Sequence, residues 1–203
     1  MEPFVAETAH YLNVTFPSVD SVCLEFINSE WGDFRGRFRE DCLLISAWRE
    51  DFLRRWGLEV EAPATQEVLH ELLALRELMR RVVASLEHGA PSQEDLEALN
   101  AALLKAPWIR RLDYAQPGFH LHSQPLAQAW NRVIGELALS FAELLVTRDP
   151  RRLKPCANPH CRWIFYDETR SRTRRYCHAE KCGNLVKLRR FRARHQREKT
   201  GTN

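Results

Sequence analysis

Four cysteines near the C-terminal end constrain this chain more than any other feature. Cys156 and Cys161 form one Cys-x4-Cys pair, Cys177 and Cys182 form a second, and 15 residues separate the pairs. Tetrahedral zinc binds four thiolates at about 2.3 Å, so a connection that folds back can bring both pairs around one ion. Four protein ligands leave no open position for water, and the single zinc ion is therefore predicted to be structural.

The residues around these cysteines favour a small unit held together by metal. Asn158 and Pro159 suit a tight turn inside the first pair, the run WIFYD predicts a strand, and TRSRTRRY can lead back to the second pair. Because so few apolar side chains cannot build much of a core, structural zinc would add the missing folding free energy. His160 and His178 lie inside the pairs and are alternative ligands.

The start of the chain and the other two cysteines bear on the redox compartment. The first residues lack a basic stretch followed by an apolar segment, so we expect no secretory signal and a reducing compartment. Clustered cysteines there bind metal more often than they form disulfides, and Cys23 and Cys42 are predicted to be small buried residues. No apolar run reaches the roughly 18 residues of a membrane span.

Charge separates the chain into two unlike parts. The formal net charge is only +3, but residues 151–203 carry 16 Lys and Arg against 4 Asp and Glu, a balance of +12, which leaves −9 for residues 1–150. A segment this basic predicts a polyanionic partner. The alternative is a basic face that is only solvated or that docks on the acidic N-terminal part of the chain. Because arginine suits bidentate contacts with phosphate and guanine, the candidate nucleic-acid-binding residues are Arg170, Arg172, Arg174, Arg175, Lys187, Arg189, Arg190, Arg192, Arg194 and Arg197.

Residues 1–150 are predicted to be mainly α-helical with one small β-hairpin. After an irregular lead-in over 1–18, and with Ser18 or Asp20 as the first cap, apolar residues recur at helical spacing over 18–30, 40–56, 66–87, 92–105 and 125–148. The stripes that begin at Leu44 and at Leu126 are expected to pack in the core. Pro117 and Gly118 favour a turn, so residues 108–122 are predicted to form the hairpin.

A change of composition around Pro150 and Pro155 predicts a domain boundary. Residues 1–150 would form the helical domain, and residues 151–203 would form a four-cysteine zinc finger that ends in a basic helix over 183–198. In that helix Leu185, Leu188 and Phe191 make a narrow apolar stripe, and Lys and Arg cover most of the remaining surface.

The motifs of both parts resemble a known family. The segments CANPHC, RYC and CGN resemble the CGNR zinc finger, and VCLEFINSEWGDFRG resembles the ABATE domain that typically precedes it. The resemblance covers nearly the whole chain and implies a bacterial, stress-induced transcription regulator with zinc on the four clustered cysteines. Leu185 stands where the motif of that finger ends in arginine, and packing in the apolar stripe is the simpler interpretation of this leucine.

The leading hypothesis is a DNA-binding transcription regulator. The finger would fix the angle of the Arg-rich helix against double-stranded DNA, and neutralising six phosphates would give a log–log salt slope of about −5. The negative charge of the helical domain excludes it as a second DNA-binding surface. This domain would instead form a homodimer or bind a small-molecule effector. A C2 dimer is the expected oligomer, because many DNA-binding proteins pair half-sites.

The alternative hypothesis is a zinc-stabilised, non-enzymatic interaction module that binds RNA or an acidic protein. Trp163, Phe165 and Tyr166 would then stack on unpaired bases, whereas in the favoured interpretation Trp163 and Phe165 pack between the turn and the helix of the finger. A preference for single strands over duplex would support RNA as the partner.

No enzyme is expected. His120 and His122 would share one face of the hairpin, and His10, Cys23 and Glu25 are the other candidates for chemistry. The chain nevertheless has no Ser/His/Asp order, no glycine-rich phosphate loop and no His-Glu-x-x-His pattern. We therefore expect a cytoplasmic regulator that joins the nucleoid when it is bound to DNA, with no membrane partner.

Overall fold

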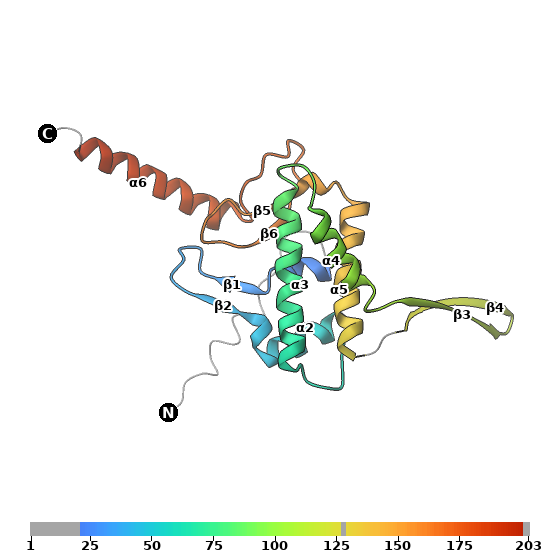
Figure 1. Cartoon of the computed structure of the whole chain (residues 1–203). Coiled ribbons are helices and arrows are strands. Elements are labelled where there is room, and N and C mark those ends of the chain that lie inside the picture. Colours follow the sequence, from blue (N-terminus) through green and yellow to red (C-terminus); the bar gives the residue numbers. More distant parts are fainter. Residues whose placement is uncertain (1–20, 127–128, 201–203) are drawn as a thin grey trace, which may run out of the picture.

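The helices of the chain gather around one long central helix. The computed structural model describes residues 21–126 and 129–200, so the predicted lead-in, Ser18, Asp20 and His10 lie outside the described residues. The central helix is α3 (Gln66–Ser85), and α1 (Val22–Ile27), α4 (Gln93–Leu103) and α5 (Ala129–Thr147) pack against it and against one another (Figure 1). None of the helices in the described ranges combines the length and apolar character needed to span a bilayer.

The sequence explains the start of two of these helices and the face they bury. The Thr65 side chain accepts a hydrogen bond from the backbone N–H of Val68, and Ser92 accepts one from Asp95, so both helices begin at a capping residue. The apolar stripe predicted for α3 is buried, with Met79 and Val82 fully inaccessible to solvent. The predicted helices over 66–87 and 92–105 are confirmed to within two residues at each end.

The close approach of α5 to the segment after α4 depends on a glycine. A Cβ atom added to Gly135 would lie 2.2 Å from the Cβ of Ala106 and 2.8 Å from its backbone nitrogen. Because Gly135 is buried in the middle of α5, any larger residue there would push the helix away from α4.

The helix predicted over 40–56 is wrong in its first part. Its start pairs as a strand, β2 (Arg39–Asp41), with β1 (Glu30–Gly32), and is followed by a 3-10 turn (Cys42–Leu44, η2) and then by α2 (Ser46–Arg55). The Asp41 carboxylate accepts a hydrogen bond from the backbone N–H of Leu43 and so caps the 3-10 turn instead of a longer helix. Leu44, expected in the core, is 58% exposed as a result.

The predicted hairpin is confirmed and is longer than expected. Strands β3 (Trp108–Ala115) and β4 (Gly118–Pro125) pair antiparallel and extend away from the helices as an arm (Figure 1). Because β4 continues to Pro125, helix α5 begins at Ala129 and not at Pro125. Leu126, predicted to lie on the buried stripe of that helix, is 58% exposed.

The C-terminal part packs directly onto the helices. It comprises η3 (Pro150–Arg152), β5 (Leu153–Pro155), β6 (Ile164–Tyr166), the π-turn η4 (Ala179–Gly183) and α6 (Asn184–Thr200). Leu153, Ile164 and Tyr166 belong to the same buried cluster as the helical core. The Asn28 side chain donates to the Ile164 carbonyl at 2.9 Å and accepts from its N–H at 2.8 Å. The small β5–β6 sheet is thereby fixed to α1 and its neighbours.

Candidate metal centre and nucleic-acid interface

The four clustered cysteines converge on one point. Their sulfur atoms all lie within 4.8 Å of one another, and the Cys161–Cys177 and Cys177–Cys182 sulfur distances are 3.7 and 3.8 Å. A tetrahedron of thiolates at 2.3 Å from zinc has edges of about 3.8 Å. The two pairs predicted from their spacing therefore meet in the geometry of a tetrahedral zinc site.

Short local elements place the cysteines. Cys156 follows β5 directly, and its N–H donates to the Trp163 carbonyl at 2.8 Å. The first pair closes as a tight turn in which the Cys161 N–H donates to the Asn158 carbonyl at 2.9 Å. Cys177 precedes η4 and Cys182 lies within it, so the second pair is held by the turn that leads into α6.

Two N–H groups point at the sulfur atoms. The backbone N–H of Cys177 donates to the Cys156 sulfur at 3.5 Å, and the side-chain amide of Asn158 donates to the Cys182 sulfur at 3.4 Å. Such donors orient metal-bound thiolates and stabilise their charge. Asn158 is fully buried and also donates to the Phe34 carbonyl at 3.0 Å, so one amide links the metal centre to the β1–β2 loop.

The chemistry of this donor set fits a divalent cation. Without a metal, the thiols of Cys161 and Cys177 are hydrogen-bonded to the Cys156 sulfur. These hydrogen bonds raise the pKa of Cys161 and of Cys177 above the ordinary value for a thiol. Four thiolates this close together repel one another unless a cation lies between them. Among the described residues the group consists of the four cysteines, and neither His160 nor His178, the alternative ligands, belongs to it.

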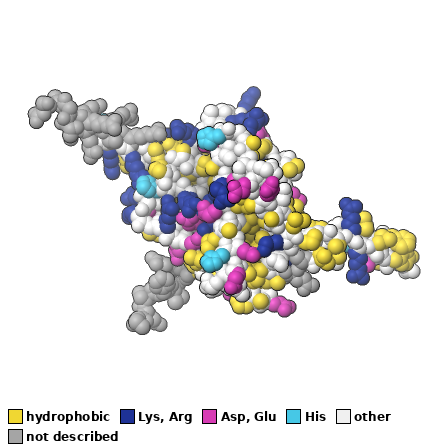
Figure 2. Space-filling view, in the orientation of Figure 1, with side chains coloured by type: hydrophobic (Ala, Val, Ile, Leu, Met, Phe, Trp, Pro, Cys, Tyr) yellow, Lys and Arg dark blue, Asp and Glu magenta, His cyan; other side chains and the backbone are white. Residues whose placement is uncertain are grey.

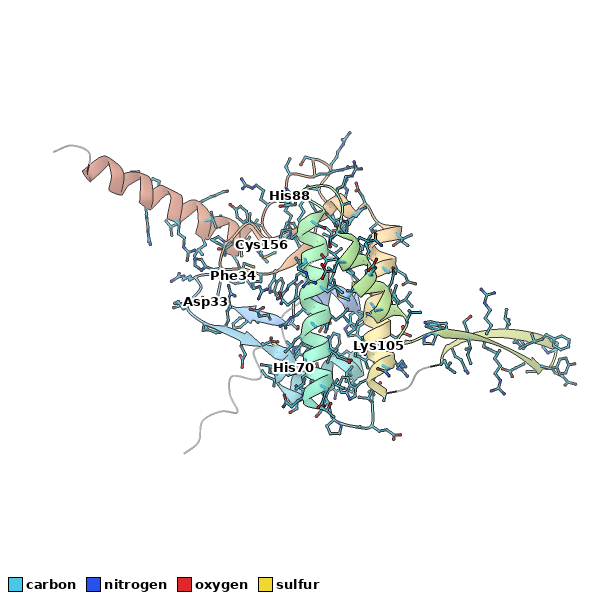
Figure 3. The ribbon with its side chains drawn as sticks, in the orientation of Figure 1. Asp33, Phe34, His70, His88, Lys105 and Cys156 are labelled. Carbon is cyan, nitrogen blue, oxygen red and sulfur yellow. The ribbon has the colours of Figure 1, made fainter. Side chains whose placement is uncertain are left out.

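The β1–β2 loop is the part of the site that sequence reasoning missed. Phe34 packs against the cysteine cluster, as Figure 3 shows next to Cys156, and the Lys181 ammonium lies 5.5 Å from its ring centre. A Cβ atom on Gly36, whose φ is +80°, would lie 2.3 Å from the His160 ring. The contact between the β1–β2 loop and the first cysteine pair joins residues more than 120 positions apart. In the sequence it is signalled locally by the loop glycine, Gly36, and by Asn158.

The predicted nucleic-acid-binding residues divide into four groups. Arg174 turns inward, where its guanidinium donates to the carbonyls of Tyr176 and Cys177 and lies 5.0 Å from the Phe165 ring centre. Arg172 pairs with Asp149 at 3.0 Å, and Arg189 donates to the Arg35 carbonyl at 2.8 Å. Four further side chains are exposed, as that of Arg172 also is; they are Arg170, Arg175, Lys187 and Arg192. The side chains of Arg190, Arg194 and Arg197 lie outside the described ones.

The apolar stripe predicted on the basic helix is only partly buried. Val186 is buried among the described side chains of α6, whereas Leu188 and Phe191 are 46% and 52% exposed. Leu185 is half-buried and lines a hollow of about 360 Å³ together with Phe34 and Leu188. Leu185 thus faces the β1–β2 loop across this hollow, whereas Leu188 and Phe191 of the same stripe are largely exposed.

Comparison with protein families identifies both parts of the chain. Residues 152–195 match the CGNR zinc finger, and residues 20–148 match ABATE, which carries the description "Putative stress-induced transcription regulator". The chain belongs to the ABATE family. No match to a curated protein accompanies these two family matches. The four clustered cysteines of this ABATE protein all lie within the matched finger.

The remaining candidates for chemistry in the ABATE protein have structural partners. The Glu25 carboxylate accepts hydrogen bonds from Arg55 at 2.9 Å and from the Trp56 ring N–H at 2.7 Å. Cys23 and Cys42 are buried as predicted, burial raises the pKa of Cys23, and burial together with neighbouring carboxylates raises that of Cys42 to about 12. Both thiols are therefore protonated at neutral pH and unreactive.

Asp167 organises the connection between the two cysteine pairs. This fully buried carboxylate accepts hydrogen bonds from the Lys154 ammonium at 2.8 Å, from the N–H of Thr169 at 3.0 Å and from the N–H of Arg174 at 3.0 Å. Burial alone would raise its pKa, but the Lys154 contact and the Thr169 hydrogen bonds outweigh burial and lower it from 3.8 to about 2. The ionised form of Asp167 thus stabilises the folded ABATE protein.

The substitution Asp167→Asn is expected to lower the free energy of unfolding by about 2 kcal/mol at neutral pH, from a pKa difference of nearly two units. Because the folded pKa is the lower one, this contribution is complete above about pH 5 and is lost as the pH falls toward 2. Urea unfolding of the zinc-loaded variants from about pH 5 to 8 should give a constant deficit. Glu168→Gln, an exposed neighbour, is the control, and a deficit that varies in this range would contradict the assignment.

Proposed function

We propose that this ABATE protein is a DNA-binding transcription regulator whose finger holds one structural zinc ion and presents a basic surface to phosphates. The observation that carries the proposal is the placement of exposed basic side chains around the four-cysteine centre. Arg170 and Arg175 lie on the connection before Cys177, and Lys187 and Arg192 lie on α6 after Cys182. Figure 2 shows Lys and Arg side chains gathered over this part of the molecule.

Zinc supplies structure in this proposal. Four thiolates complete a tetrahedral set, so the bound ion would tie the connection and α6 to one point and leave no position for a reacting water. The residues of the chain then do the binding: the turn and η4 orient α6, and the exposed cations meet phosphate oxygens. The negative charges of Glu30 and Glu77 are neutralised by Arg162, which pairs with Glu30 at 2.7 Å and with Glu77 at 2.6 Å.

The β1–β2 loop extends the proposed surface beyond the finger. The acidic helical part was expected to contribute nothing to DNA binding, yet Arg35 and Arg37 of this loop are exposed next to α6. Arg37 is paired with Asp33, whereas the Arg35 carbonyl accepts the Arg189 hydrogen bond and the Arg35 side chain is exposed, with no ion-pair partner among the described residues. We therefore include Arg35 among the phosphate-binding candidates.

The first test of this proposal is the salt dependence of duplex binding. Fluorescence anisotropy with a mixed-sequence DNA duplex should give a log–log slope of about −5, and the double variant R175Q/K187Q should lower its magnitude by about 2, because each neutralised phosphate contributes roughly 0.9. The control R110Q/R111Q removes two positive charges from the arm, at the opposite end of the molecule. A slope near zero, or equal slopes for both variants, would contradict the proposal.

Burial of two aromatic residues argues against the RNA-stacking alternative. Phe165 and Tyr166 are 4% and 6% exposed, and the Tyr166 hydroxyl accepts a hydrogen bond from the Asp149 N–H. Neither ring has a face open to an unpaired base, which such recognition requires. We accordingly expect duplex DNA to bind more tightly than single strands.

The rest of the proposal concerns the helical part and the setting. An effector would have a place beside α5, in a hollow of about 410 Å³ lined by Trp56, Glu136 and Ser140 among others, a volume within the usual range for small ligands. We infer a non-enzymatic regulator that acts in the cytoplasm and on the nucleoid.

A further inference from the structure

One face of the arm is mainly apolar and is uncovered within the described structure. Residues opposite each other in an antiparallel pair share a face, so Leu112 with Leu121 and Tyr114 with Phe119 lie on the same side of the arm as Trp108. Arg110, opposite Ser123, is the charged residue of this face and lies between Trp108 and the Leu112–Leu121 pair. The exposed fractions of these five side chains range from 48% to 73%. Figure 2 shows hydrophobic side chains along the arm, away from the helical core.

The opposite face of the arm is mainly polar, with Ile109 as its large apolar residue. Arg111 faces His122 and Asp113 faces His120 in the register, and the Arg111 guanidinium donates to Asp113 at 3.1 Å. The arm is therefore amphipathic, with one face suited to water. Because an isolated two-stranded hairpin is marginally stable in water, the apolar face needs a covering surface.

We propose that this apolar face binds the same face of the arm of a second copy of the chain. Applied to side chains of roughly 150 to 250 Å², the exposed fractions leave on the order of 600 Å² of apolar surface on each arm. Two such faces bury roughly 1,200 Å², the lower end of the range for specific protein interfaces. Three of the five residues are aromatic, the class that is enriched in the centres of such interfaces.

A contact between the same apolar face of two copies is symmetric. One apolar face that meets its own copy forms an isologous contact, which closes as a C2 dimer and leaves no further surface to propagate. Two stacked pairs of strands then resemble two packed sheets, with apolar side chains between them and the polar faces outward. The finger and α6 lie at the other end of each protomer (Figure 1), so this dimer does not depend on the proposed DNA binding.

Light scattering coupled to size exclusion tests the proposal on the zinc-loaded full chain. An interface near the lower end of the specific size range is expected to have a dissociation constant in the micromolar range, so the wild type should be largely dimeric at roughly 50 µM. The double variant L112T/L121T replaces one apolar pair by residues that retain strand propensity, and we expect it to be monomeric at that concentration. The matched control R111T/H122T changes the adjacent pair on the polar face and should remain dimeric.

Two results would overturn the proposal. One is a monomeric wild type at this concentration, and the other is an L112T/L121T variant that dimerises as strongly as the wild type. Circular dichroism spectra of the three proteins should agree closely, because the arm lies outside the buried core. A change in DNA affinity per protomer is not expected for L112T/L121T, which separates this proposal from the proposed function.

Discussion

The variant Cys177→Ser of the ABATE protein is expected to retain no stoichiometric zinc and to lose the folded finger. Cys177 lies 3.7 Å from the Cys161 sulfur and 3.8 Å from that of Cys182, so its thiolate is a corner of the tetrahedron. Binding of structural zinc supplies on the order of 10 kcal/mol of folding free energy in small fingers. Without this contribution the segment that carries the exposed arginines cannot hold its conformation.

The loss should extend into the helical core. Ile164 and Tyr166 of β6 are buried with the residues of α3 and α5, and burial of each such side chain contributes about 1.5 to 3 kcal/mol. A finger that unfolds removes both residues from the core, so the remaining helices should unfold at lower denaturant, with a loss of about 3 to 6 kcal/mol. Hydrogen exchange should show lost protection in β5 and β6 first.

Metal analysis and urea unfolding measure the two effects together. The matched control is Cys42→Ser, which makes the same atomic change at a buried cysteine outside the cluster. We expect one zinc ion per chain in the wild type and in this control, whose unfolding free energy should fall by about 1 kcal/mol. A Cys177→Ser protein that keeps one zinc ion, or whose unfolding matches the control, would show that the four cysteines do not form the structural centre.

The metal centre was predictable because its information is local. Each cysteine pair spans a few residues, and Asn158 and Pro159 between the first two indicate the turn. The hairpin arm was predictable for the same reason, from the Pro117–Gly118 turn and the strands on either side of it. Ser92 as a capping residue likewise placed the beginning of α4 correctly, and the apolar periodicity placed that of α3.

Contacts between distant segments were not predictable. Asn28 fixes Ile164, and Asn158 fixes Phe34, across 136 and 124 positions of the chain. Nothing in the local pattern of either asparagine identifies its partner, and the same is true of the buried Arg76 and its partner. Periodicity placed α3 in the core but gave no sign that a guanidinium on that helix is buried. The sequence pattern predicted the buried apolar stripe of α3, but it did not predict that Arg76 on the same helix is buried.

That buried charge gives the second large effect. Arg76 is 3% exposed, and its guanidinium donates to both Asp41 oxygens, at 2.7 and 2.5 Å, and to the Ser29 hydroxyl at 3.0 Å. Asp41→Ala removes the carboxylate that binds this guanidinium through both oxygens, and it also removes the cap of the 3-10 turn. Glu77, 3.7 Å from the Arg76 Nε, remains as a weaker partner. Breaking a buried pair by removing one partner costs about 3 to 5 kcal/mol, so Asp41→Ala is expected to lower the free energy of unfolding by about 3 kcal/mol.

Urea unfolding of Asp41→Ala should show this loss, and two further variants identify its cause. Asp113→Ala removes a carboxylate from the exposed pair with Arg111 and should change the free energy of unfolding by less than about 1 kcal/mol. The double variant D41A/R76M removes both buried charges while filling the volume of the arginine stem, so it should be more stable than Asp41→Ala alone. A double variant that is no more stable than Asp41→Ala would show that the fold depends on the carboxylate for the turn at Leu43 and not for neutralising Arg76.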